Sequence, residues 1–169
     1  LFRESTSFEH LMQVTSYDYY TYTHSVNVFV FSTALAQRLG HSEEELHIFG
    51  QGALLHDVGH LLHDLPESAP DEGIDDVHEH LGAKWLADKF PPSVVLPIRM
   101  HVAAKRYLCA VDPTYRSTLS EPSEISLQLQ GGPMTADECE EFRTRPHYLD
   151  ALSLRRWDDQ AKTAGLATP

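Results

Sequence analysis

Residues 54–60 read Leu-Leu-His-Asp-Val-Gly-His, an apolar helix end that runs into the adjacent pair His56 and Asp57. An imidazole nitrogen and a carboxylate oxygen on consecutive residues can bind one metal ion, and the second carboxylate oxygen can bridge to another. An ionisable pair at the end of an apolar stretch costs free energy unless a metal or a partner compensates. The stretch therefore predicts a metal site inside the fold.

The composition predicts one folded domain over residues 1–169, with 41% hydrophobic and 22% charged residues. No apolar run approaches the ~20 residues of a membrane-spanning helix and no secretory signal is present, so we expect a cytoplasmic protein without membrane contact. Cys109 and Cys139 lack zinc-type pairing and are expected as free thiols. The net charge of -12 argues against nucleic acid as a partner, so an anionic substrate must be held by metal or by a few placed cations.

Helical patterns recur along the chain without a convincing alternating strand, which predicts an all-α fold. A first helix is expected over His24–Leu39, ended at Gly40, where a left-handed cap is easily adopted. Ser42 and Glu45 form a capping box for a second helix, which delivers the His-Asp pair into the interior.

The rest of the chain is expected to alternate loops and helices. Residues 66–73 form a loop, and Asp76 starts a capping signal for a helix that reaches residue 90. Residues 110–122 are expected as loop. Later helices are expected over 123–130, after a capping box at residues 135–138, and over 148–162.

A helix from Ser93 to about Leu108 carries two further polar candidates. Pro97 is tolerated in its first turn. His101 and Lys105 then lie one turn apart on the same face, so both can face a shared cavity.

Histidines and acids spread over five predicted helices supply enough ligands for two metal ions. Helical bundles build metal sites in this way, from side chains of facing helices. Imidazoles and carboxylates favour Fe, Mn or Zn over a thiolate-held metal, and they do not choose among the three. The candidate ligands are His24, His56, Asp57, His78, His101 and Asp158.

Several motifs follow one another from residue 52 onward. They are Leu-Leu-His-Asp-Val-Gly-His-Leu-Leu-His-Asp-Leu-Pro-Glu (54–67), His-Glu-His-Leu-Gly-Ala (78–83), His-Val-Ala-Ala-Lys-Arg-Tyr-Leu-Cys-Ala (101–110), Ser-Leu-Gln-Leu-Gln-Gly-Gly-Pro-Met (126–134) and Leu-Arg-Arg-Trp-Asp-Asp-Gln-Ala-Lys (154–162). In this order they resemble the phosphonate oxygenases of the HD-domain superfamily. The resemblance implies an HD-domain helical bundle with a metal centre in its core.

The first fifty residues resemble another branch of the superfamily, the HD-GYP cyclic-dinucleotide phosphodiesterases. The similar stretches are Tyr-Thr-Tyr-Thr-His-Ser-Val-Asn-Val (20–28) and Leu-Gly-His-Ser-Glu-Glu-Glu-Leu (39–46). The Gly-Tyr-Pro element of that branch and its flanking His-His-Glu run are absent from the sequence.

The oxygenase resemblance implies a mixed-valent Fe(II)/Fe(III) pair on the six candidate ligands, bridged by Asp57. His78 is preferred to His80 because the ligand histidine lies four residues before a Gly-Ala step, here Gly82-Ala83. The implied reaction uses O2 to cleave the carbon–phosphorus bond of a 1-hydroxyphosphonate, such as 2-amino-1-hydroxyethylphosphonate or its trimethylated analogue, and releases inorganic phosphate. The positions matched around the phosphonate are His60, Lys105, Ser123, Gln128 and Arg155, of which His60 and Lys105 are the expected catalytic residues.

Two other functions use the same residues. A metal-dependent phosphohydrolase acting on a nucleotide or another phosphoester would need no redox change, and Mn, Mg or Zn would serve to activate water. A non-enzymatic HD domain that binds a metal or a ligand is the third possibility, because shared ligands do not fix shared chemistry.

Overall fold

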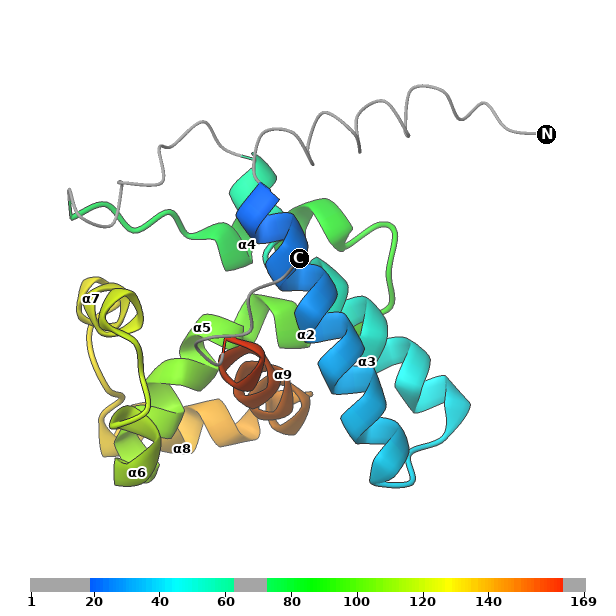
Figure 1. Cartoon of the computed structure of the whole chain (residues 1–169). Coiled ribbons are helices and arrows are strands. Elements are labelled where there is room, and N and C mark those ends of the chain that lie inside the picture. The colour runs from blue at the N-terminus through cyan, green and yellow to red at the C-terminus, as the bar shows by residue number, and fades with distance from the viewer. Residues whose placement is uncertain (1–18, 63–72, 163–169) are drawn as a thin grey trace.

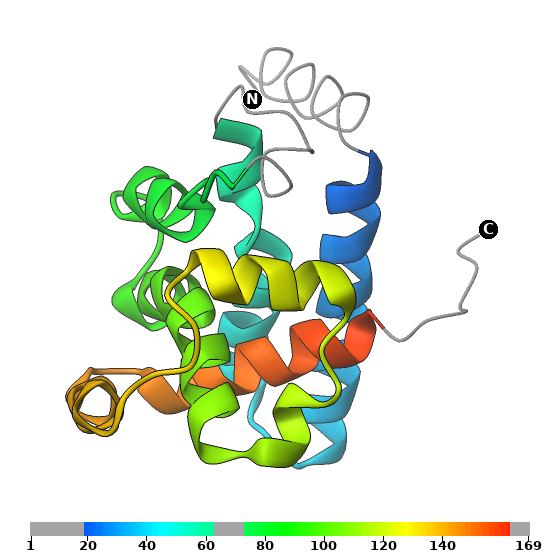
Figure 2. The ribbon, with the colours of Figure 1, turned by 90° about the vertical axis from the view of Figure 1, so that its left-hand side faces the viewer.

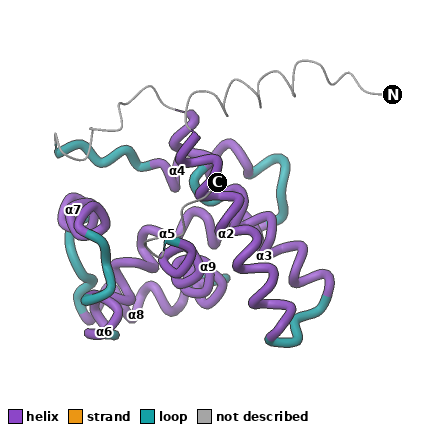
Figure 3. Tube along the Cα trace, in the orientation of Figure 1, coloured by secondary structure: helices purple, strands orange, loops and turns teal. Residues whose placement is uncertain are grey.

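The computed structural model describes residues 19–62 and 73–162, and every regular element in these two ranges is a helix (Figures 1 and 3). The elements are α2 (Tyr19–Arg38), α3 (Glu43–Leu55), the 3-10 helix η1 (Val58–Leu62), α4 (His78–Leu86), α5 (Pro92–Val111), α6 (Pro113–Arg116), α7 (Glu121–Leu129), α8 (Ala136–Thr144) and α9 (Tyr148–Ala161). The all-α prediction is confirmed. None of the described helices is long and apolar enough to cross a membrane.

The helical pair α2 and α3 forms around the turn that the sequence predicts. Gly40 has a φ of +84°, its N–H donates to the Gln37 carbonyl at 3.1 Å, and the N–H of His41 donates to the Ala36 carbonyl at 3.2 Å. These two bonds satisfy carbonyls at the end of α2 in a Schellman motif. The capping box of Ser42 and Glu45 then starts α3, as expected.

Helix α5 is the centre of the fold and packs against α3, α4, α6, α8 and α9. Its buried side chains join three apolar clusters, represented by Ile98, Ala104 and Leu108. The first cluster also receives Val28 from α2 and Leu154 from α9, so helices far apart in sequence meet around one core. Figure 2 shows α7 lying across the side of this core that faces the viewer.

Three predicted boundaries are wrong. Helix α2 begins at Tyr19, five residues before the expected start, and α4 ends at Leu86 rather than near residue 90. Helix α5 begins at Pro92, so Pro97 lies in its second turn. Proline fits the first helical position because the N–H that it lacks has no partner there.

The predicted loop over 110–122 and the predicted cap at Asp76 also need correction. The first range contains the end of α5, the short helix α6 and the start of α7, which Ser120 caps by accepting the N–H of Ser123. The N-cap of α4 is Val77, not Asp76. The loop predicted over 66–73 lies outside the described residues, except for Gly73.

Candidate metal centre

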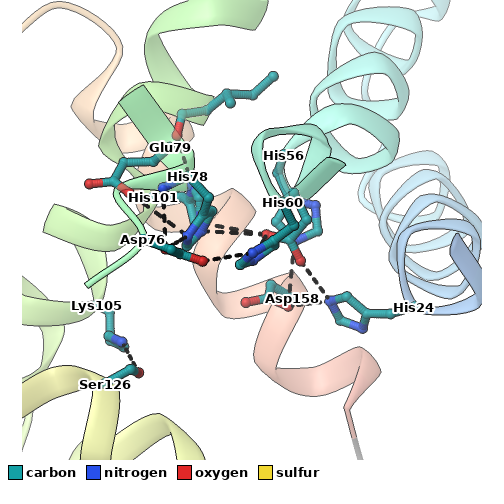
Figure 4. Close-up of polar contacts among 12 residues, drawn as sticks. His24, His56, His60, Asp76, His78, Glu79, His101, Lys105, Ser126 and Asp158 are labelled. Carbon is teal, nitrogen blue, oxygen red and sulfur yellow. Dashed lines mark hydrogen bonds and ion pairs between the residues drawn. The ribbon is translucent and has the colours of Figure 1, made fainter. Parts of the chain in front are cut away.

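The six predicted metal ligands come from five helical segments and converge in the interior (Figure 4). His24 lies in α2, His56 and Asp57 follow α3, and His78 is the first residue of α4. The other two are His101 in α5 and Asp158 in α9. The Nδ1 atom of His56 lies 2.8 Å from the carbonyl of Ala53, which turns its Nε2 atom toward the cluster.

One carboxylate oxygen of Asp57, Oδ2, belongs to a first group of ligands. It lies 3.1 Å from Nε2 of His56 and 3.6 Å from Nε2 of His24. Oδ1 of Asp158 closes the group, at 2.8 Å from His24 Nε2 and 3.6 Å from His56 Nε2. Two imidazoles and two carboxylate oxygens thus surround one point.

The other oxygen of Asp57, Oδ1, belongs to a second group made of imidazoles. The Nε2 atoms of His78 and His101 each lie 3.7 Å from it, and Nε2 of His60 lies 4.0 Å from it. The two groups therefore meet at one carboxylate, an arrangement that lets Asp57 bridge two metal ions.

The contacts within the second group fit a cation. Nε2 of His78 and Nε2 of His101 lie 3.1 Å apart. The Nδ1 atoms of both rings face acceptors, Asp76 Oδ1 at 2.7 Å and the Ile98 carbonyl at 2.7 Å, so Nδ1 carries the proton in each ring. In the neutral rings two Nε2 lone pairs then face each other, and a metal ion between them would turn this repulsion into coordination.

The charges of the ligands in both groups also fit metal binding. Burial alone lowers the pKa of His56, but Asp57 and Asp158 raise it to about 10. Burial alone raises the pKa of Asp57, but His56 holds it well below its usual range. Burial, together with His78 and His56, holds the pKa of His101 well below 6.5. A bound metal ion would take the place of the protons on the ligand imidazoles.

A cavity of about 250 Å³ opens beside these ligands, and its other wall is cationic. The lining includes Lys105 from α5, Ser123 and Ser126 from α7, and Arg155 and Lys162 from the end of the chain. A cavity of this size suits a small molecule, and its charges suit an anion.

Lys105 is the most deeply placed cation of this wall, with an exposed fraction of 3%. Its Nζ donates to Oγ of Ser126 at 2.8 Å (Figure 4). Burial and the neighbouring Arg155 and Lys162 lower the pKa of Lys105 to about 7. A lysine that titrates near neutrality is typical of functional sites.

Arg155 is buried and links the cavity to the metal ligands. Its NH1 lies 3.0 Å from Oδ2 of Asp158, and its Nε donates to Tyr115 and Asp159 at 3.1 and 3.0 Å. The next residue, Arg156, lies on the exposed side of α9 and pairs with Asp112 at 3.2 Å.

Two residues that the sequence analysis considered, Gln128 and His80, lie apart from the metal ligands. Gln128 is exposed, donates to Glu124 at 2.9 Å and does not line the cavity, whereas Gln130 does. His80 is also exposed and bonds Glu79, so the preferred His78 is the histidine that faces the centre.

Sequence reasoning missed Ser126, Lys162, Tyr115 and the site role of Asp76. Ser126 lies three residues after Ser123, one turn along the same helix, and this spacing is the signal that could have found it. The role of Asp76 in the site could not be recognised from the sequence, because an acidic residue before a helix is usually explained as an N-cap.

Comparison with known proteins agrees with this geometry. The family model described as "HD domain" matches residues 21–118. The 1-hydroxy-2-(trimethylamino)ethylphosphonate dioxygenase (glycine-betaine-forming) of Leisingera caerulea is 42% identical over 135 residues, which are 80% of this chain and 67% of the relative. The hydroxymethylphosphonate dioxygenase of Gimesia maris is 48% identical over 118 residues, 69% of this chain and 59% of the relative.

This chain therefore belongs to the HD-domain family. Both relatives are named as phosphonate dioxygenases, which confirms the predicted oxygenase branch of that family. The chain spans about two thirds of the first relative and less than two thirds of the second.

Proposed function

We propose that this protein is a di-iron dioxygenase that cleaves the carbon–phosphorus bond of a 1-hydroxyphosphonate with O2 and releases inorganic phosphate. The observation that carries the proposal is the position of Asp57, with one carboxylate oxygen in each of two imidazole groups. These groups form one wall of a cavity whose other wall is cationic. The named activities of the two relatives support the same reaction class.

In this proposal the six ligands hold two iron ions. His24, His56, Asp57 and Asp158 would hold the first ion, and Asp57, His78 and His101 would hold the second, because these side chains converge in two adjoining groups. Iron supplies the redox chemistry with O2 that amino-acid side chains lack. The donor set of imidazoles and carboxylates suits iron, and oxygenase chemistry distinguishes iron from Zn or Mg.

The cationic wall holds the phosphonate group. Lys105 donates to the hydroxyl of Ser126 in the lining, and the guanidinium of Arg155 and the ammonium of Lys162 lie along the same lining. Charge-assisted hydrogen bonds of this kind offset the desolvation of a doubly charged anion. In this proposal His60 holds the substrate hydroxyl, which is supported by its position in the cavity lining, 4.0 Å from Oδ1 of Asp57.

We propose 2-amino-1-hydroxyethylphosphonate or its trimethylated analogue as substrate. The atoms balance when one molecule of O2 is consumed for each substrate. The carbon that loses phosphorus becomes a carboxyl group, and the phosphonate leaves as phosphate.

The test is an oxygen electrode combined with a phosphate assay on the iron-loaded protein. We expect one phosphate per O2 consumed with a 1-hydroxyphosphonate, and no phosphate under anaerobic conditions. Anaerobic release of phosphate, or cleavage of a phosphodiester by the Mn-loaded protein, would replace the oxygenase by the hydrolase.

A further inference from the structure

The carboxylate of Asp76 contacts two imidazoles of the centre at once (Figure 4). Its Oδ1 lies 2.7 Å from Nδ1 of His78, and its Oδ2 lies 2.8 Å from Nδ1 of His60. His60 belongs to η1 and His78 to α4, so one side chain connects two of the three segments that carry the second imidazole group.

The backbone next to Asp76 is built to allow this contact. Val77 has a φ of +46°, a left-handed conformation that is unusual for a β-branched residue. Such conformations cost free energy and persist where the surrounding structure requires them. The turn brings Asp76 back onto the start of α4, where its Oδ1 also accepts the backbone N–H of His78 at 3.3 Å.

The contact decides which nitrogen of each ring carries the proton. Each oxygen of the Asp76 side chain lies within hydrogen-bond distance of one ring nitrogen, Nδ1 of His78 or Nδ1 of His60. A carboxylate only accepts, and both rings therefore donate through Nδ1. The Nε2 atoms are left facing Oδ1 of Asp57, at 4.0 Å from His60 and 3.7 Å from His78.

The two rings also pack against each other. Their centroids lie 4.0 Å apart with an angle of 20° between the ring planes. A shift of one ring therefore displaces the other.

We propose that Asp76 is a positioning residue of the metal centre, which fixes His78 for the second metal ion and His60 for the substrate. The substrate part rests on the proposed function, whereas the metal part does not. A histidine ligand whose far nitrogen bonds a carboxylate is held in one tautomer and one orientation, and losing that partner costs about 10- to 100-fold in metal affinity.

The test replaces the carboxylate by an amide in Asp76→Asn, with Asp75→Asn as the matched control. An amide has a single acceptor oxygen, so it can accept from one ring and must present N–H donors to the other. If that ring is His78, it turns over or moves its proton to Nε2, where the proton blocks coordination. If it is His60, His78 still loses the stronger, charge-assisted hydrogen bond that held it in place. Asp75 is exposed and lies next to Asp76, so its variant controls for the loss of one negative charge.

The readout is anaerobic calorimetric titration of the metal-free protein with Fe(II). We expect two binding events in the wild type and in Asp75→Asn, with the weaker event of Asp76→Asn reduced at least tenfold in affinity. Two unchanged events in Asp76→Asn would overturn the proposal. Circular dichroism checks the fold, and Asp76→Glu should recover part of the second event because it restores the carboxylate.

A second measurement needs no variant. Nitrogen-15 NMR of the metal-free wild type distinguishes the histidine tautomers, and we expect His60 and His78 to be protonated at Nδ1. Protons at Nε2 alone in both rings would overturn the proposal. If these results hold but no hydroxyphosphonate is oxidised, the proposed function fails while the role of Asp76 in metal binding stands.

Discussion

Asp57 divides its two carboxylate oxygens between two sets of imidazoles, and at the residue scale this division explains why the His-Asp pair must be adjacent. Nε2 of His56 lies 3.1 Å from Oδ2 of Asp57, while Oδ1 of the same carboxylate faces His78 and His101. A longer spacing would separate the imidazole of the first group from the carboxylate that joins both groups.

The variant Asp57→Ala should bind neither metal ion at concentrations that load the wild type. The substitution removes one ligand from each group at once, and it leaves neighbouring imidazoles without the compensating charge. Metal analysis by mass spectrometry after desalting measures the loss. Asp75→Ala is the control and should keep both ions, whereas full occupancy in Asp57→Ala would refute the bridging role.

Lys105 should make phosphonate binding dependent on pH. The pKa of Lys105 falls from its ordinary 10.5 to about 7 because of burial and because Arg155 and Lys162 on the α9 side repel its charge. Asp159 and Cys109 act in the opposite direction and are outweighed. The ammonium form therefore predominates below about pH 7 and is lost above it, so affinity for an anion should fall as the pH rises.

The expected effect is a loss of up to about tenfold in affinity per pH unit above the pKa. Lys105→Arg is the control, because arginine stays charged throughout and the titration of the ligand itself is common to both proteins. Anaerobic binding of hydroxymethylphosphonate between pH 6 and 9 provides the measurement. Parallel pH profiles for the two proteins would show that Lys105 does not control binding.

At the scale of the elements, η1 and α4 approach so closely that only glycine fits between them. A Cβ on Gly59 would lie 1.9 Å from the backbone carbonyl oxygen of His78, a backbone atom that cannot move aside alone. The contact therefore sets the position of His78 relative to the His-Asp pair.

Gly59→Ala should weaken binding of the second metal ion and destabilise the fold by more than about 1 kcal/mol, within the cost of overpacking a core. Gly52→Ala is its matched control, because a Cβ there meets nothing within 4 Å and α3 gains helix propensity, worth about 0.5–1 kcal/mol. Urea unfolding and Fe(II) titration of both variants measure the two effects. Equal stability of the two variants would contradict the close approach.

Helix α9 depends on its buried arginine. Arg155 contacts Asp158, Asp159 and Tyr115, so Arg155→Ala takes one cation from the buried Asp158 and the guanidinium partner from the half-buried Asp159, and it should cost up to about 3–5 kcal/mol. Arg156→Ala removes an exposed pair with Asp112 and should cost about 1 kcal/mol or less. Urea unfolding of the metal-free proteins compares their free energies of unfolding. Similar losses of stability in both variants would mean that Arg155 contributes no more to the fold than an exposed arginine.

The elements also show what the sequence could predict. The helix caps at Ser42, Gly40 and Thr135 could be predicted because each depends only on residues within one helical turn. The structure contains all three. The rotation of α7 is not local. Packing turns Ser126 toward Lys105 and leaves Gln128 exposed on Glu124, which no short pattern determines.

The six candidate ligands could be predicted from the sequence because they lie in motifs that occur in a recognisable order. The structure brings these six side chains together. Asp76 could not be found in that way. Its role depends on the left-handed Val77 and on the approach of η1 to α4, and both arise only in the folded chain.

At the scale of the whole molecule, the charge balance separates the surface from the site. The chain carries a net charge of -12, while the cavity gathers Lys105, Arg155 and Lys162 along one wall. An anionic substrate is thus attracted by the local charges of the cavity rather than by the general surface.

The most direct test of the account is a crystal structure of the protein loaded anaerobically with iron, with anomalous diffraction recorded at the iron edge. The account predicts two anomalous peaks in each chain, one beside each carboxylate oxygen of Asp57. A single peak, or two peaks that do not share Asp57, would contradict it.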